Sequence, residues 1–172
     1  MNTDGAGTSL EVIILIGLQA SGKSTFFHTH FALTHAHVSK DLLHNTSKPA
    51  RRQQQLIEEA LQAGHSVVVD NTNPTKEERE KLIALGHFYG AKVIGYYFEV
   101  QMRQSLERNK SRQGKARVPD VAIFTTRKRL VRPSSEEGFD RLFSVRTLGD
   151  QTFEVSDWKE EIQNMHPKST GT

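Results

Sequence analysis

Short apolar runs alternate with helix-like segments along this chain. The strongest run, at 12–16, is continuous and rich in β-branched residues, which is typical of a strand buried on both faces of a sheet. The other expected strands are 37–39, 66–70, 92–98 and 141–146, with 152–155 as a further edge. The expected helices are 23–31, 51–63, 75–89, 101–112 and one that begins at Pro119.

This alternation predicts an α/β fold, with a parallel sheet of about five strands and helices on both of its faces. The 172 residues fit one domain of ordinary size, and no internal repeat or domain linker interrupts them. We expect a disordered N-terminal tail at 1–9, the folded domain at 10–163 and a loose C-terminal tail at 164–172.

The composition narrows the classes of protein. The chain has no cysteine, which excludes a disulfide framework and a thiolate metal site and suits a reducing cytosol. The longest apolar run, at 12–16, is far too short to cross a bilayer, and the N-terminus has no secretory signal pattern. We therefore expect a cytoplasmic protein that does not act at a membrane.

Basic residues gather in one region, although the net charge is only +3. They greatly outnumber Glu107 and Asp120 there, and such an excess attracts polyanions such as ATP or nucleic acid. A solvated basic face is the alternative interpretation. The residues are Arg103, Arg108, Lys110, Arg112, Lys115, Arg117, Arg127, Lys128, Arg129 and Arg132.

A phosphate-binding motif follows the first strand. Gly17-Leu-Gln-Ala-Ser-Gly-Lys-Ser24 matches G-x-x-x-x-G-K-[ST], between an apolar strand and a predicted helix. The glycines let successive backbone N–H groups point inward as an anion nest, while Lys23 reaches the β- and γ-phosphates and Ser24 offers a hydroxyl to Mg²⁺. The motif indicates nucleotide binding, which kinases, ATPases and GTPases share. The candidate nucleotide contacts are Gly17, Ala20, Ser21, Gly22, Lys23, Ser24 and Thr25.

Polar residues at the ends of the next two strands are candidates for chemistry, because ligands of open α/β sheets bind at the carboxyl ends of the strands. Asp41 follows the second strand, where it can accept a proton from an acceptor hydroxyl or merely cap a helical turn. Asp70-Asn-Thr-Asn73 ends the third strand and suits metal-bound water or an acceptor, with a plain turn as the alternative.

Arginines on a predicted helix are candidates for a lid. Arg108 and Arg112 are four residues apart, so they share one helix face, and Gly114 gives the following loop freedom to close over a nucleotide.

Histidines at 28, 30, 35 and 37 raise the question of zinc. We do not expect a zinc site, since residues two apart on a helix point to different faces.

Several segments together resemble the kinase module of 5′-hydroxyl polynucleotide kinases, which occur in phage and animal DNA- and RNA-repair enzymes. They occur in the family's order, span about 12–145, and are far more specific as a set than singly. The matching pieces are Gly17-Leu-Gln-Ala-Ser-Gly-Lys-Ser-Thr-Phe26, Val38-Ser-Lys-Asp41, Val67-Val-Val-Asp-Asn-Thr-Asn-Pro74, Arg108-Asn-Lys-Ser-Arg112, Val118-Pro-Asp120, Arg127-Lys-Arg129 and Glu137-Gly-Phe139.

The resemblance implies a P-loop NTPase fold of the nucleoside-kinase-like type, with an arginine-bearing lid, ATP as phosphoryl donor, Mg²⁺ as cofactor and a 5′-OH nucleic-acid end as acceptor. Asp41 aligns with the family's catalytic aspartate, and Arg112 aligns with the lid arginine that clamps the donor phosphates. Arg108 is a weaker match. The implied catalytic residues are Asp41, Lys23 and Arg112, the metal ligands Ser24 and Asp70, and the acceptor contacts Asp41, His44, Asp70, Asn71, Thr72 and Asn73.

One position departs from the family pattern. His44 stands where the phage enzyme has an arginine for the acceptor's phosphate, three residues after the catalytic aspartate. Histidine is shorter and often neutral, so the preference among acceptors can differ. No residues remain for the phosphatase or ligase domains of the family, so we expect a free-standing kinase or a module of a longer protein.

Three functions follow from these observations. The leading hypothesis is ATP-dependent phosphorylation of a polynucleotide 5′-OH end, DNA or RNA. The alternative is the same transfer to a small hydroxyl acceptor such as a nucleoside, metabolite or antibiotic. A nucleotide-gated binding protein without an acceptor is a third possibility, which the lack of a second acidic residue beside Asp70 disfavours.

Overall fold

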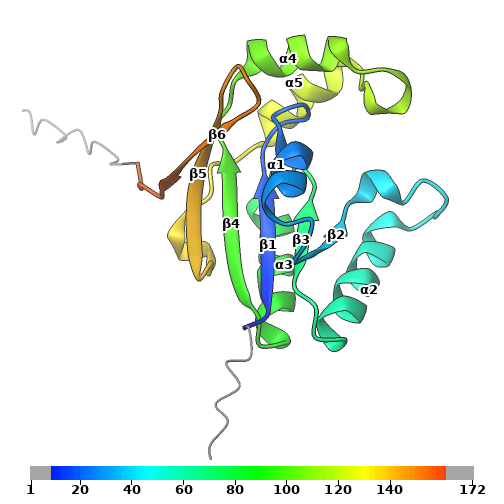
Figure 1. Cartoon of the computed structure of the whole chain (residues 1–172), viewed down its shortest axis with the longest axis vertical. Helices are drawn as coiled ribbons and strands as arrows, with labels where there is room; N and C mark the ends of the chain where they lie inside the picture. The colour runs from blue at the N-terminus through cyan, green and yellow to red at the C-terminus, as the bar shows by residue number, and fades with distance from the viewer. Residues whose placement is uncertain (1–8, 162–172) are drawn as a thin grey trace, which may run out of the picture.

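The computed structural model describes residues 9–161, which form a six-stranded sheet flanked by helices (Figure 1). The strand order is β2-β3-β1-β4-β5-β6, and all neighbours are parallel except β5 and β6. The strands are β1 Glu11–Ile16, β2 Ala36–Val38, β3 Val67–Asp70, β4 Lys92–Phe98, β5 Arg141–Thr147 and β6 Phe153–Asp157. The helices are α1 Lys23–His30, α2 Pro49–Gln62, α3 Lys76–Phe88, α4 Met102–Ser111 and α5 Asp120–Arg129, with short 3₁₀ turns at Lys40–Leu42, Gly114–Ala116 and Ser135–Glu137.

The predicted α/β fold is confirmed. The further edge expected at 152–155 forms β6, the sixth strand, which pairs antiparallel with β5 in a sheet that is otherwise parallel. The tails expected at 1–9 and 164–172 lie outside the described residues, apart from Ser9. In the described part of the chain, no helix is both long and apolar enough to cross a membrane.

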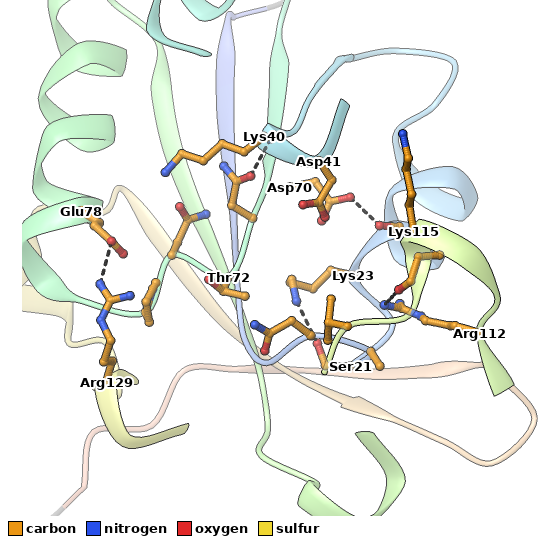
Figure 2. Close-up of a pocket in the computed structure, with 18 of the residues that line it drawn as sticks. Ser21, Lys23, Lys40, Asp41, Asp70, Thr72, Glu78, Arg112, Lys115 and Arg129 are labelled. Atoms are coloured by element: carbon orange, nitrogen blue, oxygen red, sulfur yellow. Dashed lines mark hydrogen bonds and ion pairs between the residues drawn. The ribbon is translucent and has the colours of Figure 1, made fainter. Parts of the chain in front are cut away.

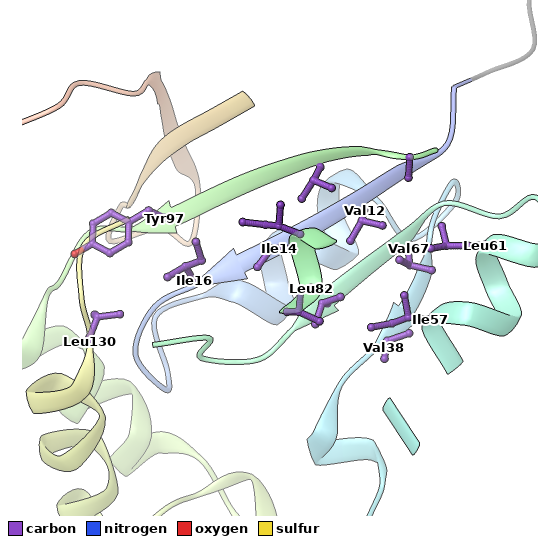
Figure 3. Packing of buried hydrophobic residues seen from close by; sticks show 14 of the residues in the cluster. Val12, Ile14, Ile16, Val38, Ile57, Leu61, Val67, Leu82, Tyr97 and Leu130 are labelled. Carbon is purple, nitrogen blue, oxygen red and sulfur yellow. The ribbon is translucent and has the colours of Figure 1, made fainter. Parts of the chain in front are cut away.

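The apolar core lies on both faces of the central strand β1. Val12, Ile14 and Ile16 belong to one buried cluster, whereas Ile13 and Leu15 belong to another, because successive side chains of a strand point to opposite faces. The first cluster includes side chains of α2 and α3, as Figure 3 shows. Burial on both faces explains why the run at 12–16 contains no polar residue.

A buried ion pair fastens α3 to the segment before β5. Arg79 is fully buried, and its guanidinium donates from Nε and Nη2 to the two carboxylate oxygens of Glu137, each at 2.7 Å. Its Nη1 donates to the backbone oxygens of Asn73, Pro74 and Val131. The guanidinium therefore links the loop after β3, which belongs to the site described below, to the connection between α5 and β5.

We expect Glu137→Ala to lower the free energy of unfolding by about 3–5 kcal/mol, because it leaves the charge of Arg79 buried without its partner. Urea denaturation measures the change. The matched control is Glu136→Ala, which removes an exposed carboxylate one residue away and should change stability by no more than about 0.5 kcal/mol. Equal stabilities of the two variants would contradict the assignment.

Candidate active site

The loop of residues 17–24, here called the P-loop, joins β1 to α1. Gly17 passes so close to β4 that a Cβ atom at this position would lie 2.9 Å from Cβ of Phe98. Gly22 precedes α1 in a left-handed conformation with φ of 99°, which favours glycine. These two constraints explain the glycines of the motif. They shape a loop whose backbone N–H groups, with those of the first turn of α1, suit an anion.

The ammonium of Lys23 lies inside this loop. It donates hydrogen bonds to the carbonyl oxygen of Gly17 at 3.1 Å, to that of Leu18, and to Oγ of Ser21 at 3.3 Å. Burial lowers the pKa of Lys23 to about 8, against the partial opposition of the negative charges of Asp70 and Asp41. A phosphate group in the loop would add negative charge beside this buried cation and favour its charged form.

A cavity of about 680 Å³ opens beside the P-loop. Lys23 and Asp41 both line it, as Figure 2 shows, so the lysine and the carboxylate predicted from separate motifs face a common space. The predicted site residues that line it are Ala20, Ser21, Lys23, Ser24, Asp41, His44, Asp70, Asn71, Thr72, Asn73 and Arg112.

The carboxylate of Asp70 lies beside the P-loop hydroxyl. Its Oδ2 accepts hydrogen bonds from Oγ of Ser24 at 2.7 Å and from Nε2 of His37 at 2.9 Å. Burial acts to raise the pKa of Asp70, but these hydrogen bonds and the charge of Lys23 outweigh it and hold the pKa below its ordinary value. An ionised carboxylate next to a hydroxyl is a donor set that fits Mg²⁺.

His37 is a site residue that sequence reasoning considered only as a zinc ligand. Its ring stacks on Phe27 of α1, with centroids 4.0 Å apart and an interplanar angle of 12°, and this stacking aims Nε2 at Asp70. His35 instead contacts Glu11 at 3.1 Å. The sequence held one signal for this contact. His37 lies in β2, which pairs with β3, and β3 ends in Asp70, so the two side chains could be expected to lie close together.

The segment Asp70–Asn73 is bonded largely to the protein itself. The backbone N–H of Gly17 donates to the carbonyl oxygen of Thr72 at 3.0 Å. Nδ2 of Asn73 donates to the carbonyl oxygen of Leu15 at 2.7 Å, and the Asn73 side chain is buried. The amide of Asn71 also has protein partners at both ends. All four residues of the segment 70–73 line the cavity, but the side chains of Asn71 and Asn73 are hydrogen-bonded to the protein and hold the cavity wall in place.

Arg112 and Arg108 reach the P-loop from the end of α4. Arg112 lines the main cavity and also a second one of about 270 Å³, on the side of the P-loop that faces the β5–β6 connection. Arg108 lines only the second cavity, together with the predicted contacts Gly22 and Thr25. Both arginines therefore line the second cavity, and Arg112, which directly follows the end of α4 at Ser111, also lines the main one.

Further cations line the main cavity, and sequence reasoning did not assign them to the site. Lys40 and Lys115 come from the turn after β2 and the loop after α4. Arg129, at the end of α5, donates to the carboxylate of Glu78 at 3.0 Å. The basic region noticed in the sequence was the available signal for Lys115 and Arg129, but it did not indicate which of its members face the cavity.

The fold and the cavity define a P-loop protein of the kinase type, in which a phosphate-binding loop and a second carboxyl end of the same sheet share one site. The chain belongs to the family described as "AAA domain" (AAA_33), a P-loop kinase domain, which matches residues 12–133. A P-loop kinase is a phosphotransferase with ATP as its expected donor.

Two relatives carry names that agree with this class. A bifunctional polynucleotide phosphatase/kinase of Schizosaccharomyces pombe is 28% identical over 139 residues, which cover 78% of this chain and 33% of the relative. The chain spans about a third of the length of this relative and of a second, a putative bifunctional polynucleotide phosphatase/kinase of Acanthamoeba polyphaga mimivirus, which is 29% identical over 150 residues.

Solved structures share the fold at low sequence identity. A Pnkp1/Rnl/Hen1 RNA repair complex aligns with a TM-score of 0.61 and 20% identity, over 76% of this chain and 47% of that one. A gluconokinase from Sinorhizobium meliloti 1021 aligns with a TM-score of 0.59 and 21% identity, over 79% and 82%. These likenesses establish the architecture of the chain.

We expect ATP affinity to fall as pH rises through about 8. The pKa of Lys23 is lowered to about 8, so the ammonium that would contact the phosphates is charged below that pH and neutral above it. Calorimetric titration with ATP from pH 7 to 9.5 should show a loss that approaches tenfold per pH unit above the pKa.

The control for this titration is Lys23→Arg. A guanidinium stays charged over the whole range, so its profile should be flat even if its affinity is lower. A flat profile for the unmodified protein would show that the charge of Lys23 does not govern ATP binding.

Proposed function

We propose that this P-loop kinase transfers the γ-phosphoryl group of ATP to the 5′-hydroxyl end of a polynucleotide. The observation that carries the proposal is that Lys23 and Asp41 line the same cavity. ATP and the acceptor hydroxyl could therefore bind in one cavity, with a phosphate-binding cation beside the first and a proton-accepting carboxylate beside the second. Positioning of this kind, together with charge stabilisation, accounts for most of the catalysis in phosphoryl transfer.

In the proposed reaction, the acceptor oxygen attacks the γ-phosphorus while its proton passes to the carboxylate of Asp41. The bond from the γ-phosphorus to the oxygen that bridges it to the β-phosphate breaks, and ADP leaves with that electron pair. Lys23 and Arg112 offset the charge on the transferring group. Ser24 and Asp70 would hold Mg²⁺, which when bound neutralises charge on the donor phosphates.

The polynucleotide acceptor is supported by charge and by the relatives. Lys40 and Lys115 line the cavity in addition to Lys23 and Arg112, and their positive charge suits the phosphates of a polynucleotide. The Schizosaccharomyces pombe relative is named as a polynucleotide phosphatase/kinase. His44 also lines the cavity, and we propose that it contacts the acceptor near Asp41.

We expect Asp41→Asn to retain ATP binding and to lose about 10²–10⁴-fold in turnover, because the amide cannot take the acceptor proton. Transfer of label from γ-labelled ATP to a 5′-OH oligonucleotide measures turnover, and calorimetry measures ATP binding. The matched control is Glu77→Gln, an exposed carboxyl-to-amide change on α3 away from the cavity lining, which should leave both unchanged. Near-normal turnover of Asp41→Asn would remove Asp41 from the mechanism.

The acceptor class is tested with the unmodified protein. Matched 5′-OH DNA and RNA oligonucleotides, a nucleoside and a sugar acid are offered over a range of salt concentrations. The proposal expects label on an oligonucleotide, with a rate that falls as salt rises because phosphate contacts are screened. Label on a nucleoside or sugar acid, with none on any oligonucleotide, would contradict the polynucleotide proposal and favour a small hydroxyl acceptor.

A further inference from the structure

We infer that Gln53 and Asn71 are positioning residues for Asp41: their two side-chain amides fix the turn that carries this carboxylate to the sheet and to α2. The inference rests on the proposed function in that it takes Asp41 as the group that meets the acceptor. Both side chains are neutral and lie outside the phosphate-binding loop. Neither role follows from the motif pattern of the sequence.

The turn that carries Asp41 has little apolar anchorage of its own. It is the 3₁₀ turn Lys40–Leu42, all three of whose residues are exposed, and Leu42 exposes 62% of its surface. Because its side chains are exposed, the turn depends for its position on the hydrogen bonds that its first backbone N–H groups make. Oγ of Ser39 accepts from the N–H of Asp41 at 3.3 Å, and Oδ1 of Asn71 accepts from the N–H of Lys40 at 2.9 Å.

The amide of Asn71 connects this turn to α2 with a fixed polarity. The backbone N–H of Lys40 can only donate, so Asn71 must present its oxygen to it and its NH₂ group to the other side. That NH₂ group donates to Oε1 of Gln53 at 2.6 Å. Asn71 directly follows Asp70, the last residue of β3, so the turn takes its position from the end of a central strand.

Gln53 stands where the helix pattern calls for an apolar residue. Together with Ile57 and Leu61 it forms the buried stripe of α2, with residues four apart along one face. Gln53 is only 7% exposed, and Ile57 and Leu61 belong to the apolar core. A buried polar group is costly unless it is hydrogen-bonded, so the bond to Asn71 explains why an amide is tolerated here.

Loss of the hydrogen bond between Gln53 and Asn71 should affect catalysis more than ATP binding. Loss of the Gln53 oxygen frees the amide of Asn71 to rotate, and the N–H of Lys40 then loses its fixed acceptor. The turn can shift by a fraction of its own width, which leaves the P-loop untouched. A displacement of about 1 Å at a catalytic group can cost about 10²-fold in rate.

The experiment compares three glutamine variants by steady-state kinetics. We expect Gln53→Leu to lower kcat for a 5′-OH oligonucleotide by about 10- to 100-fold, with the Kd for ATP unchanged. Gln53→Glu keeps a side-chain oxygen for Asn71 and should retain most of kcat. Gln54→Leu makes the same chemical change at the neighbouring exposed position and should match the unmodified protein. If Gln53→Leu does not fold, Gln53→Met takes its place.

A second measurement reads the turn without any acceptor. Hydrogen exchange of the Lys40 amide, followed by NMR, should be faster in Gln53→Leu than in Gln54→Leu, whereas the amides of β1 stay protected. Unchanged exchange at Lys40 together with unchanged kcat in a folded Gln53→Leu protein would overturn the inference. If the unmodified protein labels no oligonucleotide, the proposed function fails, and the exchange of Lys40 alone decides the positioning role.

Discussion

The geometry of the site depends on one short stretch of hydrogen bonds, at residues 70–73 after β3. This stretch bonds to Ser24 and Gly17 of the P-loop, to the end of β1 at Leu15, and to the turn after β2 at Lys40. It can reach all of them because β3 lies between β2 and β1 in the sheet. Loops that follow neighbouring parallel strands emerge at the same edge, so the middle one sets the spacing of the outer two.

Two of the carboxylates that line the cavity, Asp70 and Asp41, differ because their surroundings differ. Asp70 is buried and receives two side-chain hydrogen bonds on one oxygen, which hold its pKa low and favour the ionised form that its proposed role at Mg²⁺ requires. Asp41 sits on an exposed turn that is fixed through backbone N–H groups, and within residues 9–161 no side chain donates to its carboxylate. The carboxylate of Asp70 is thus engaged by the protein, whereas that of Asp41 is left open to an acceptor.

The sheet, the helices and the P-loop could be predicted because their signals are local. Buried strands are continuous apolar runs, and the P-loop is a short motif without a gap at 17–24. The close approach of Gly17 to Phe98 of β4 is a long-range contact that the motif does not show. The roles of Gln53 and His37 could not be predicted, since each depends on a partner from another element. Gln53 does interrupt an apolar stripe, and that is a readable signal. The sequence also located the cluster at 70–73, but it could not tell that two of its side chains face inward.

The loop after β3 is fixed by a charged pair, whereas the turn of Asp41 is fixed by neutral amides. The ion pair between Arg79 and Glu137 is buried away from the reactants, where its charges compensate each other and only fix the loop after β3. The turn of Asp41 is anchored by neutral amides instead. Neither amide carries a charge that could pair with the carboxylate of Asp41, which we propose as the proton acceptor. Neutral anchorage therefore allows the turn to be rigid while Asp41 stays free to react, and it leaves the positive charge of the cavity for the phosphates.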